Sequence, residues 1–309
     1  MIPTKHLIEQ VPPQRNWRRR LRAFYHRSES VRGYALLSPT LVVMAVAMCI
    51  PFGIMILMSF WTQVGWDFDT TLTLANYEKT IDRPIFSRLL LRSLAISGIC
   101  TLATILLSYP MAYYVAFHVH KNKLLWIILM TLPFWTSYLL RIFTWKVILG
   151  YQGAINSGLL YLGFIDAPLE FLLHSPTAVV ITLTHAWAAF AILPIYVSLE
   201  KIDKSLLEAS ADLGDGPVAR FLRVTLPLSL PGVVASTILI FIPTVGDYVT
   251  PIMVGGPDGL MIGNMIQLQF GTVNNWPLGA AYAISMMLVV AFIAFIFALI
   301  TKKALRQIA

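Results

Sequence analysis

The stretch EASADLGDGPVARFLRVTLPLSLPG, from Glu208 to Gly232, is a polar, helix-forming island in an otherwise apolar chain. It gathers three acidic and two arginine residues around a Gly-Asp-Gly-Pro turn at 214–217. The pattern predicts one short helix over 204–213, in which Ser205 and Glu208 have the spacing of a capping box. A second short helix is expected over 218–224, because the glycine and proline between the two favour a turn.

The composition around this stretch is that of an integral membrane protein. Of the 309 residues, 57% are hydrophobic and 12% are charged, whereas about 25% of the residues in a soluble domain are charged. The two cysteines, Cys49 and Cys100, both lie in apolar runs. This placement favours neither a disulfide framework nor a metal cluster, and no metal site is expected.

Six runs of the sequence are long and apolar enough to cross a bilayer, for which a helix needs about 20 residues. They are Leu36–Trp61, Leu94–Phe117, Leu124–Leu149, Ala178–Leu199, Val233–Val254 and Ala280–Ile300. Because backbone groups in lipid must hydrogen-bond within their own segment, we expect an all-α polytopic membrane protein. Pro227 and Pro231 are expected to break the chain before the fifth run.

The basic residues are distributed unequally between the two sides of the predicted spans. Most of the 23 Lys and Arg residues lie in the two tails or in the second and fourth loops, and such residues favour the cytoplasmic side. The sequence therefore predicts a basic cytoplasmic tail over 1–34, a membrane domain over 35–301 and a short cytoplasmic tail over 302–309. The polar stretch then belongs to a cytoplasmic loop at about 200–231.

The arginine-rich tail, RNWRRRLRAFYHR, is interpreted as a topology signal that also contacts anionic lipid headgroups. A specific partner for this tail is the alternative. Nucleic acid binding is not expected, because the basic residues follow the membrane topology.

Within the cytoplasmic loop, EASADLG followed by FLRVTLPLSLPG resembles the EAA loop of binding-protein-dependent ABC importer permeases. The pattern of that family is Glu-Ala-Ala, three residues, Gly, and then a Phe and a Leu-Pro. The matching residues are Glu208, Ala209, Gly214, Phe221, Leu226 and Pro227. Two positions depart from the pattern: Ser210 replaces the second alanine, and Asp215 follows the glycine where a small residue is usual.

The resemblance implies the fold of a type I ABC importer permease in a bacterial inner membrane, with this loop docked on a separate ATPase subunit. The implied coupling residues are Glu208, Ala209, Ser210, Gly214, Phe221 and Pro227. Glu208 would pair with a basic group of the ATPase subunit, and Phe221 and Leu222 would anchor the loop from beneath. The alternative is a loop that caps the membrane domain and has no partner.

The implied partners are two ABC ATPase subunits, a second and non-identical permease subunit, an extracytoplasmic solute-binding protein and the lipid bilayer. The chain carries no Walker glycine loop, so ATP and Mg are assigned to the ATPase subunits and the chain itself is not predicted to be an enzyme or to hold a cofactor. The competing classes are a secondary transporter that works alone and a membrane-embedded enzyme.

Longer stretches resemble the spermidine/putrescine branch of these permeases. They include LPFWTSYLLRIFTWKVIL, GAINSGLLYLGFIDAPLEFL and VGDYVTPIMVGGPDGLMIGNMIQLQF. The resemblance implies that the chain moves polyamines into the cytoplasm by alternating access. The alternative is another small solute carried by related branches, such as iron, sulfate, thiamine or an opine-like compound.

One carboxylate, that of Asp247, lies within an apolar span, in FIPTVGDYVTP. Intramembrane carboxylates are costly and usually functional. Pro243 and Gly246 beside it indicate a kinked or partly opened helix, and we place Asp247 on the path of a cationic substrate. The residues that would supply aromatic faces to that cation are Tyr248, Trp135, Tyr138 and Trp187.

An ion pair with Arg141 is the alternative role for Asp247. At about 1.5 Å of rise per residue, the two residues lie at similar depth in the outer half of the membrane. Arg141 itself is interpreted as a structural or gating residue, because its charge would repel a polyamine.

Overall fold

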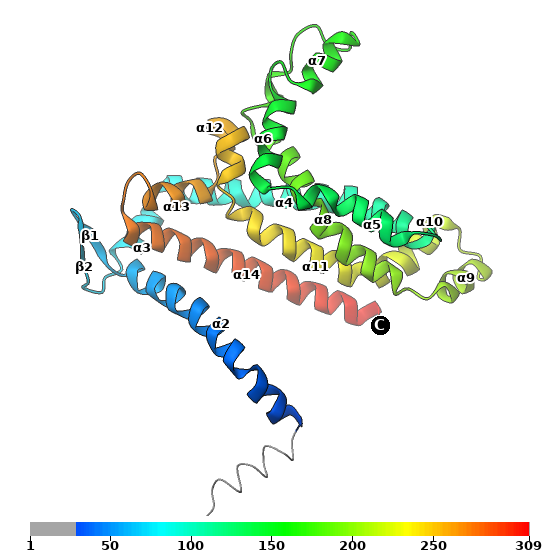
Figure 1. Ribbon diagram of the computed structural model, residues 1–309, viewed down its shortest axis with the longest axis horizontal. Coiled ribbons are helices and arrows are strands. Elements are labelled where there is room, and N and C mark those ends of the chain that lie inside the picture. The colour runs from blue at the N-terminus through cyan, green and yellow to red at the C-terminus, as the bar shows by residue number, and fades with distance from the viewer. Residues whose placement is uncertain (1–28, 309) are drawn as a thin grey trace, which may run out of the picture. The chain divides into compact units, whose positions relative to one another are not determined.

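The computed structural model describes residues 29–308, most of which are helical. The predicted tail over 1–34 therefore lies almost entirely outside the described residues. The chain divides into two units, the first ending at Met55 and the second beginning at Ile56. Most of α2 (Glu29–Ser59), which contains the first predicted span, belongs to the first unit (Figure 1).

The second unit begins at the end of α2 and continues into a hairpin of β1 (Thr62–Val64) and β2 (Asp67–Asp69), which pair antiparallel. The helices that follow are α3 (Ala75–Asp82), α4 (Pro84–Phe117), α5 (Lys123–Thr131), η1 (Leu132–Trp135), α6 (Tyr138–Leu149), α7 (Ala154–Tyr161), η2 (Glu170–Leu172) and α8 (Pro176–Glu200). The remaining helices are α9 (Lys204–Asp212), α10 (Pro217–Arg220), the π-helical η3 (Phe221–Thr225), α11 (Leu226–Val245), the π-helical η4 (Pro251–Gly255), α12 (Gly256–Gly259), α13 (Ile262–Phe270) and α14 (Trp276–Ile308).

The first, second, fourth and sixth predicted spans are confirmed as long apolar helices, and they lie in α2, α4, α8 and α14. The fifth, expected over 233–254, instead covers Pro217–Val245, so it begins inside the polar stretch. Within residues 29–308, five helices are long and apolar enough to span a membrane, or six if a bent pair is counted as one span. The predicted tail over 302–309 continues α14 as far as Ile308.

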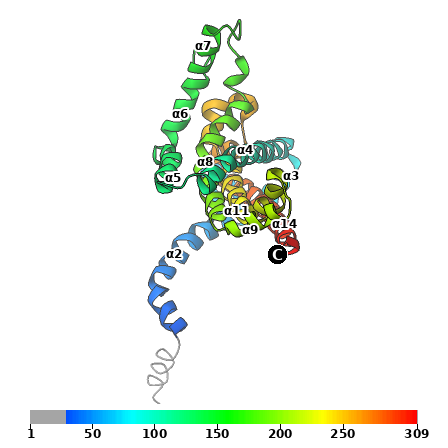
Figure 2. The same cartoon turned by 90° about the vertical axis from the view of Figure 1, so that its right-hand side faces the viewer.

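The bent pair is the third predicted span, which is not one straight helix. The segment from Lys123 to Trp135 meets the segment from Tyr138 to Tyr161 at 85°. In both views α7 extends away from the helices α4, α8 and α11, whereas α6 packs against α8 and η4 (Figures 1 and 2). Pro133 lies in the 3-10 turn of η1, and Thr136 is extended, with φ −78° and ψ 154°. The prediction of a continuous helix was wrong because proline cannot donate the next helical hydrogen bond.

The core of the second unit is a bundle in which α8 packs against α4 and α11, and α11 also contacts α14 (Figure 1). Its buried side chains are mostly small or β-branched, among them Ala112, Ala116, Ala191, Ile195 and Ile240. Between α11 and α8, Ser236 Oγ donates a hydrogen bond of 3.1 Å to the carbonyl of Ala191. Small side chains let membrane helices approach closely, and this packing fixes α11 against α8.

A close approach of α11 to α8 depends on Gly232. A Cβ added there would lie 2.5 Å from the carbonyl oxygen of Pro194 and 2.6 Å from Ser198 Cβ. We expect Gly232→Ala to lower the free energy of unfolding by about 1–3 kcal/mol, because the two backbones must move apart. A melting curve of the purified protein in detergent measures the effect.

Gly98→Ala is the matched control, since a Cβ at that helical position meets nothing within 4 Å. It is expected to leave the melting temperature unchanged or slightly raised. Equal melting temperatures for the two variants would contradict the close packing at Gly232.

Candidate functional site

The first half of the polar stretch folds as predicted into a short helix, α9. Its N-cap, however, is Asp203, whose Oδ1 accepts a hydrogen bond of 3.0 Å from the backbone N–H of Ser205. The predicted capping box of Ser205 and Glu208 was therefore wrong by two residues. The bond from the Ser205 backbone lowers the pKa of the Asp203 carboxyl below its ordinary value.

The helix ends at the turn that the glycine pattern indicated. Gly214 has φ +93°, a conformation that favours glycine. Asp215, whose contacts no sequence pattern indicated, accepts hydrogen bonds from Ser210 Oγ at 2.9 Å and from Arg223 Nη1 at 2.6 Å. Ser210 is buried, whereas Ala209 beside it is exposed.

The second half of the stretch runs without interruption from α10 through η3 into α11. Pro227 and Pro231 lie inside this span rather than breaking the chain. The π-helical η3 directly precedes Pro227, and local π adjustments of this kind let a membrane helix accommodate proline. Phe221 packs edge-on against Tyr109 and Tyr113 of α4, with ring centroids 5.7 and 6.1 Å away, so it anchors the loop as predicted. Leu222 does not share that role, since it is 54% exposed.

The exposed surface of the loop combines a carboxylate with two apolar side chains. Glu208 is exposed and, among the residues that the structure describes, makes no ion pair. Leu213 and Val218, on either side of the turn, are 87% and 71% exposed. Sequence reasoning missed these two residues, because it expected the apolar side chains of the loop to turn inward and nothing in the local pattern distinguishes an exposed leucine or valine from a buried one.

The second candidate site lies where α11 ends, at Val245. The backbone is not helical at Gly246–Tyr248, which confirms the predicted opening of the helix around Asp247. Asp247 Oδ2 accepts a hydrogen bond of 2.7 Å from the Tyr138 hydroxyl, and its Oδ1 accepts one of 2.9 Å from the backbone N–H of Val249. The Tyr138 hydroxyl also lies 2.9 Å from Thr250 Oγ1, so the carboxylate is held in one orientation.

Gly263 lets α13 pack closely against the non-helical segment Gly246–Tyr248. A Cβ on Gly263 would lie 2.5 Å from the carbonyl oxygen of Gly246 and 2.9 Å from that of Asp247. The amide of Asn264 donates a hydrogen bond of 2.7 Å to the carbonyl of Tyr248. The carbonyls of Gly246 and Asp247 are therefore covered by α13, and a third carbonyl, that of Tyr248, receives a donor from it.

Arg141 does not form the ion pair that was the alternative for Asp247. Its Nη1 donates to the carbonyl of Ala186 at 2.8 Å, and its Nη2 donates to the carbonyls of Phe134 and Thr136, both at 3.0 Å. Phe134 and Thr136 flank the break of the third span, so the guanidinium satisfies carbonyls that lost their helical partners. The structural role predicted for Arg141 agrees with these contacts.

The predicted aromatic residues do not gather at one place. A cavity of about 390 Å³ is lined by Tyr138, Arg141 and Trp187, together with Phe134 and Phe190. Tyr248 lines a different cavity, of about 490 Å³, next to α13 and α14. Trp135 is 78% exposed and lines neither. Tyr138 is therefore the link between Asp247 and the aromatic cavity.

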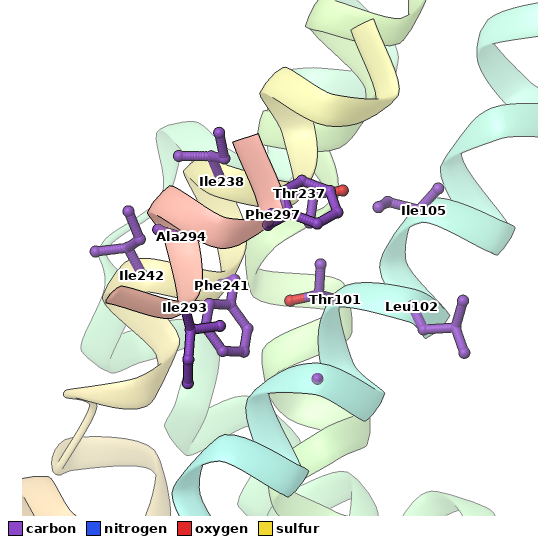
Figure 3. Close-up of a pocket in the computed structure, with 11 residues that line it drawn as sticks. Thr101, Leu102, Ile105, Thr237, Ile238, Phe241, Ile242, Ile293, Ala294 and Phe297 are labelled. Atoms are coloured by element: carbon purple, nitrogen blue, oxygen red, sulfur yellow. The ribbon is translucent and has the colours of Figure 1, made fainter. Parts of the chain in front are cut away.

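A further pocket, between α4, α11 and α14, offers no polar group for a solute (Figure 3). Its volume is about 270 Å³, and its lining is apolar apart from two threonines. Both hydroxyls are already used within their own helices, since Thr101 donates to Ser97 and Thr237 donates to Val233. Nor do the described residues hold a group of three or more His, Cys, Asp or Glu side chains that could bind a metal ion.

The chain matches the family described as "Binding-protein-dependent transport system inner membrane component" over residues 32–306. It is 38% identical over 240 residues to the spermidine/putrescine transport system permease protein PotB of Escherichia coli, with 77% of this chain and 86% of that protein aligned. To the PotB protein of Haemophilus influenzae it is 35% identical over 276 residues, or 89% of this chain and 92% of that protein.

The fold is similar to that of a chain in the crystal structure of a bacterial ABC transporter involved in the import of the acidic polysaccharide alginate. The TM-score is 0.70 at 17% sequence identity, over 92% of this chain and 99% of that chain. This likeness confirms the predicted all-α permease fold. With the family match over residues 32–306, it follows that this chain belongs to the binding-protein-dependent transport system inner membrane components, the multi-pass permease subunits of ABC transporters.

Proposed function

We propose that this chain is a permease subunit of an ATP-driven importer that moves polyamines such as spermidine and putrescine into the cytoplasm. The observation that carries the proposal is the 38% identity to a permease named for spermidine and putrescine, over 77% of the chain. The second such relative, aligned over 89% of the chain, supports it.

The chemistry around Asp247 supports a cationic substrate. Its carboxylate lies at the break of an apolar span and is oriented by a tyrosine beside an aromatic cavity. Carboxylates and aromatic faces are the groups that hold an ammonium ion. The guanidinium of Arg141, which also lines this cavity, donates to three backbone carbonyls. Their dipoles partly compensate its positive charge.

The loop over about 200–231, which we call the coupling loop, supports an energy source in a separate subunit. In the proposed assembly, Glu208 and the exposed Leu213 and Val218 dock on one of two ABC ATPase subunits, which bind ATP and Mg. Both termini and this loop face the cytoplasm, and a second, non-identical permease subunit completes the pathway. A solute-binding protein delivers the polyamine from the opposite side, and closure of the ATPase subunits drives alternating access through α9 and α11.

Reconstitution of the complete transporter into proteoliposomes tests the proposal. We expect uptake of labelled spermidine or putrescine that requires both the binding protein and ATP, with little uptake of iron, sulfate or thiamine. Selective uptake of one of those solutes would overturn the polyamine assignment. Uptake without nucleotide would instead identify a secondary transporter.

A further inference from the structure

The two residues of the coupling loop that depart from the EAA pattern contact each other. Ser210 Oγ donates to Asp215 Oδ2 at 2.9 Å, and the backbone N–H of Asp215 donates to the carbonyl of Ser210 at 3.1 Å. The serine hydroxyl thus donates a hydrogen bond to one oxygen of this partly buried carboxylate. Ser210 itself is 5% exposed, so its hydroxyl would be buried without a partner if the carboxylate were removed.

A third residue extends this contact to the far side of the turn. Arg223 Nη1 pairs with Asp215 Oδ1 at 2.6 Å, and the side chain of Asp215 is only 19% exposed, against 72% for Arg223. Both carboxylate oxygens are therefore occupied by donors from different elements, Ser210 on α9 and Arg223 on η3. We call this arrangement of Ser210, Asp215 and Arg223 the clasp.

The three residues of the clasp flank the two exposed apolar residues of the loop along the chain. Leu213 lies between Ser210 and Asp215 along the chain, and Val218 lies between Asp215 and Arg223. The left-handed Gly214 would otherwise be a flexible point between them. With both ends fixed to one carboxylate, α9 and the turn are joined to η3, which continues directly into the transmembrane helix α11.

We propose that Ser210, Asp215 and Arg223 are positioning residues that make the coupling loop a rigid unit, so that a movement of the ATPase subunit reaches α11 instead of being absorbed in the turn. The inference rests on the proposed function, because it assumes that this loop is the contact with the ATPase. It assigns to Asp215 the role of central acceptor for the clasp.

The test compares transport with ATP hydrolysis in the complete reconstituted transporter. In Asp215→Ala and Arg223→Gln we expect the number of polyamine molecules moved per ATP to fall by about threefold or more, while ATP hydrolysis and the KM for binding-protein-delivered substrate persist. Arg223→Lys keeps the charge and is expected to recover part of the ratio. Arg220→Gln is the matched control, since Arg220 lies in the same loop and forms no ion pair within the described part of the chain.

A measurement independent of activity uses a nitroxide label at Leu213→Cys, with Cys49 and Cys100 replaced by serine. We expect the label to become more mobile in Asp215→Ala than in Arg220→Gln.

An unchanged ratio of polyamine moved to ATP hydrolysed in Asp215→Ala would overturn the role of the clasp and leave the proposed function intact, provided that the complex assembles and the wild type couples transport to ATP. Loss of the ATPase subunit from the variant complex would overturn it too, by assigning the residues to docking. A wild type without ATP-driven polyamine uptake would refute the proposed function instead.

Discussion

The variant Asp247→Asn is expected to lower the rate of polyamine uptake by about 10- to 100-fold. A hydrogen bond that involves a charged group contributes about 1.5–3 kcal/mol, and each 1.4 kcal/mol changes an equilibrium by about tenfold. Asparagine has nearly the same shape, and its amide oxygen can still accept a hydrogen bond from Tyr138 or Val249. The loss of uptake in this variant would therefore measure the contribution of the negative charge of Asp247. Uptake of labelled spermidine by the reconstituted transporter measures it.

The control for this variant is Tyr138→Phe, which removes the hydroxyl bonded to Asp247 and leaves the carboxylate in place. A smaller loss of uptake is expected, because the charge persists while its orientation is less restricted. Co-purification of the ATPase subunit should be unaffected in both variants, since the length of α11, 20 residues or about 30 Å, separates Asp247 from the coupling loop. Normal polyamine transport by Asp247→Asn would remove Asp247 from the substrate path.

Reversing the charge of Glu208 is expected to abolish the stimulation of ATP hydrolysis by the binding protein. Glu208 is exposed on α9 and forms no ion pair among the described residues, so in the proposed assembly it is available to pair with a basic group of the ATPase subunit. Removing one partner of a buried interfacial charge pair costs about 2–5 kcal/mol. Glu208→Lys adds repulsion to that loss, and the ATPase subunit should either dissociate or hydrolyse ATP at its unstimulated rate.

Phosphate release from the complex in nanodiscs, with and without the binding protein, measures this effect. Glu78→Lys makes the same charge reversal at another exposed glutamate, on α3, outside the coupling loop. It should leave the stimulated rate close to that of the wild type. If Glu208→Lys kept full stimulation, the docking role of this residue would be refuted.

Several features of this protein were predictable because they depend on residues that are close in the chain. Long apolar runs predicted the helices that became α2, α4, α8 and α14. A glycine followed by a proline predicted the turn after α9, and Pro243 with Gly246 predicted the opening at Asp247. The two breaks follow from local backbone chemistry: proline lacks the N–H that a helix needs, and Gly214 adopts a left-handed conformation that favours glycine.

The tertiary structure decided which partner each buried polar group meets. Similar depth in the membrane made Arg141 a plausible partner for Asp247, yet the guanidinium donates to Ala186, 45 residues away along the chain. The break of the third span brought the carbonyls of Phe134 and Thr136 within reach of the same group. Because an arginine satisfies whichever acceptors the packed backbone presents, depth alone could not identify them.

The same distinction applies to the stretch from Glu208 to Gly232. By itself the sequence determined that this stretch forms two short helices around a turn, through its apolar spacing and its Gly-Asp-Gly-Pro tip. The tertiary structure decided that Asp215 joins Ser210 to Arg223 across that turn, and that the second helix continues into α11 despite two prolines. A side chain's contacts across a turn depend on how the flanking helices pack, and here Phe221 against α4 sets that packing.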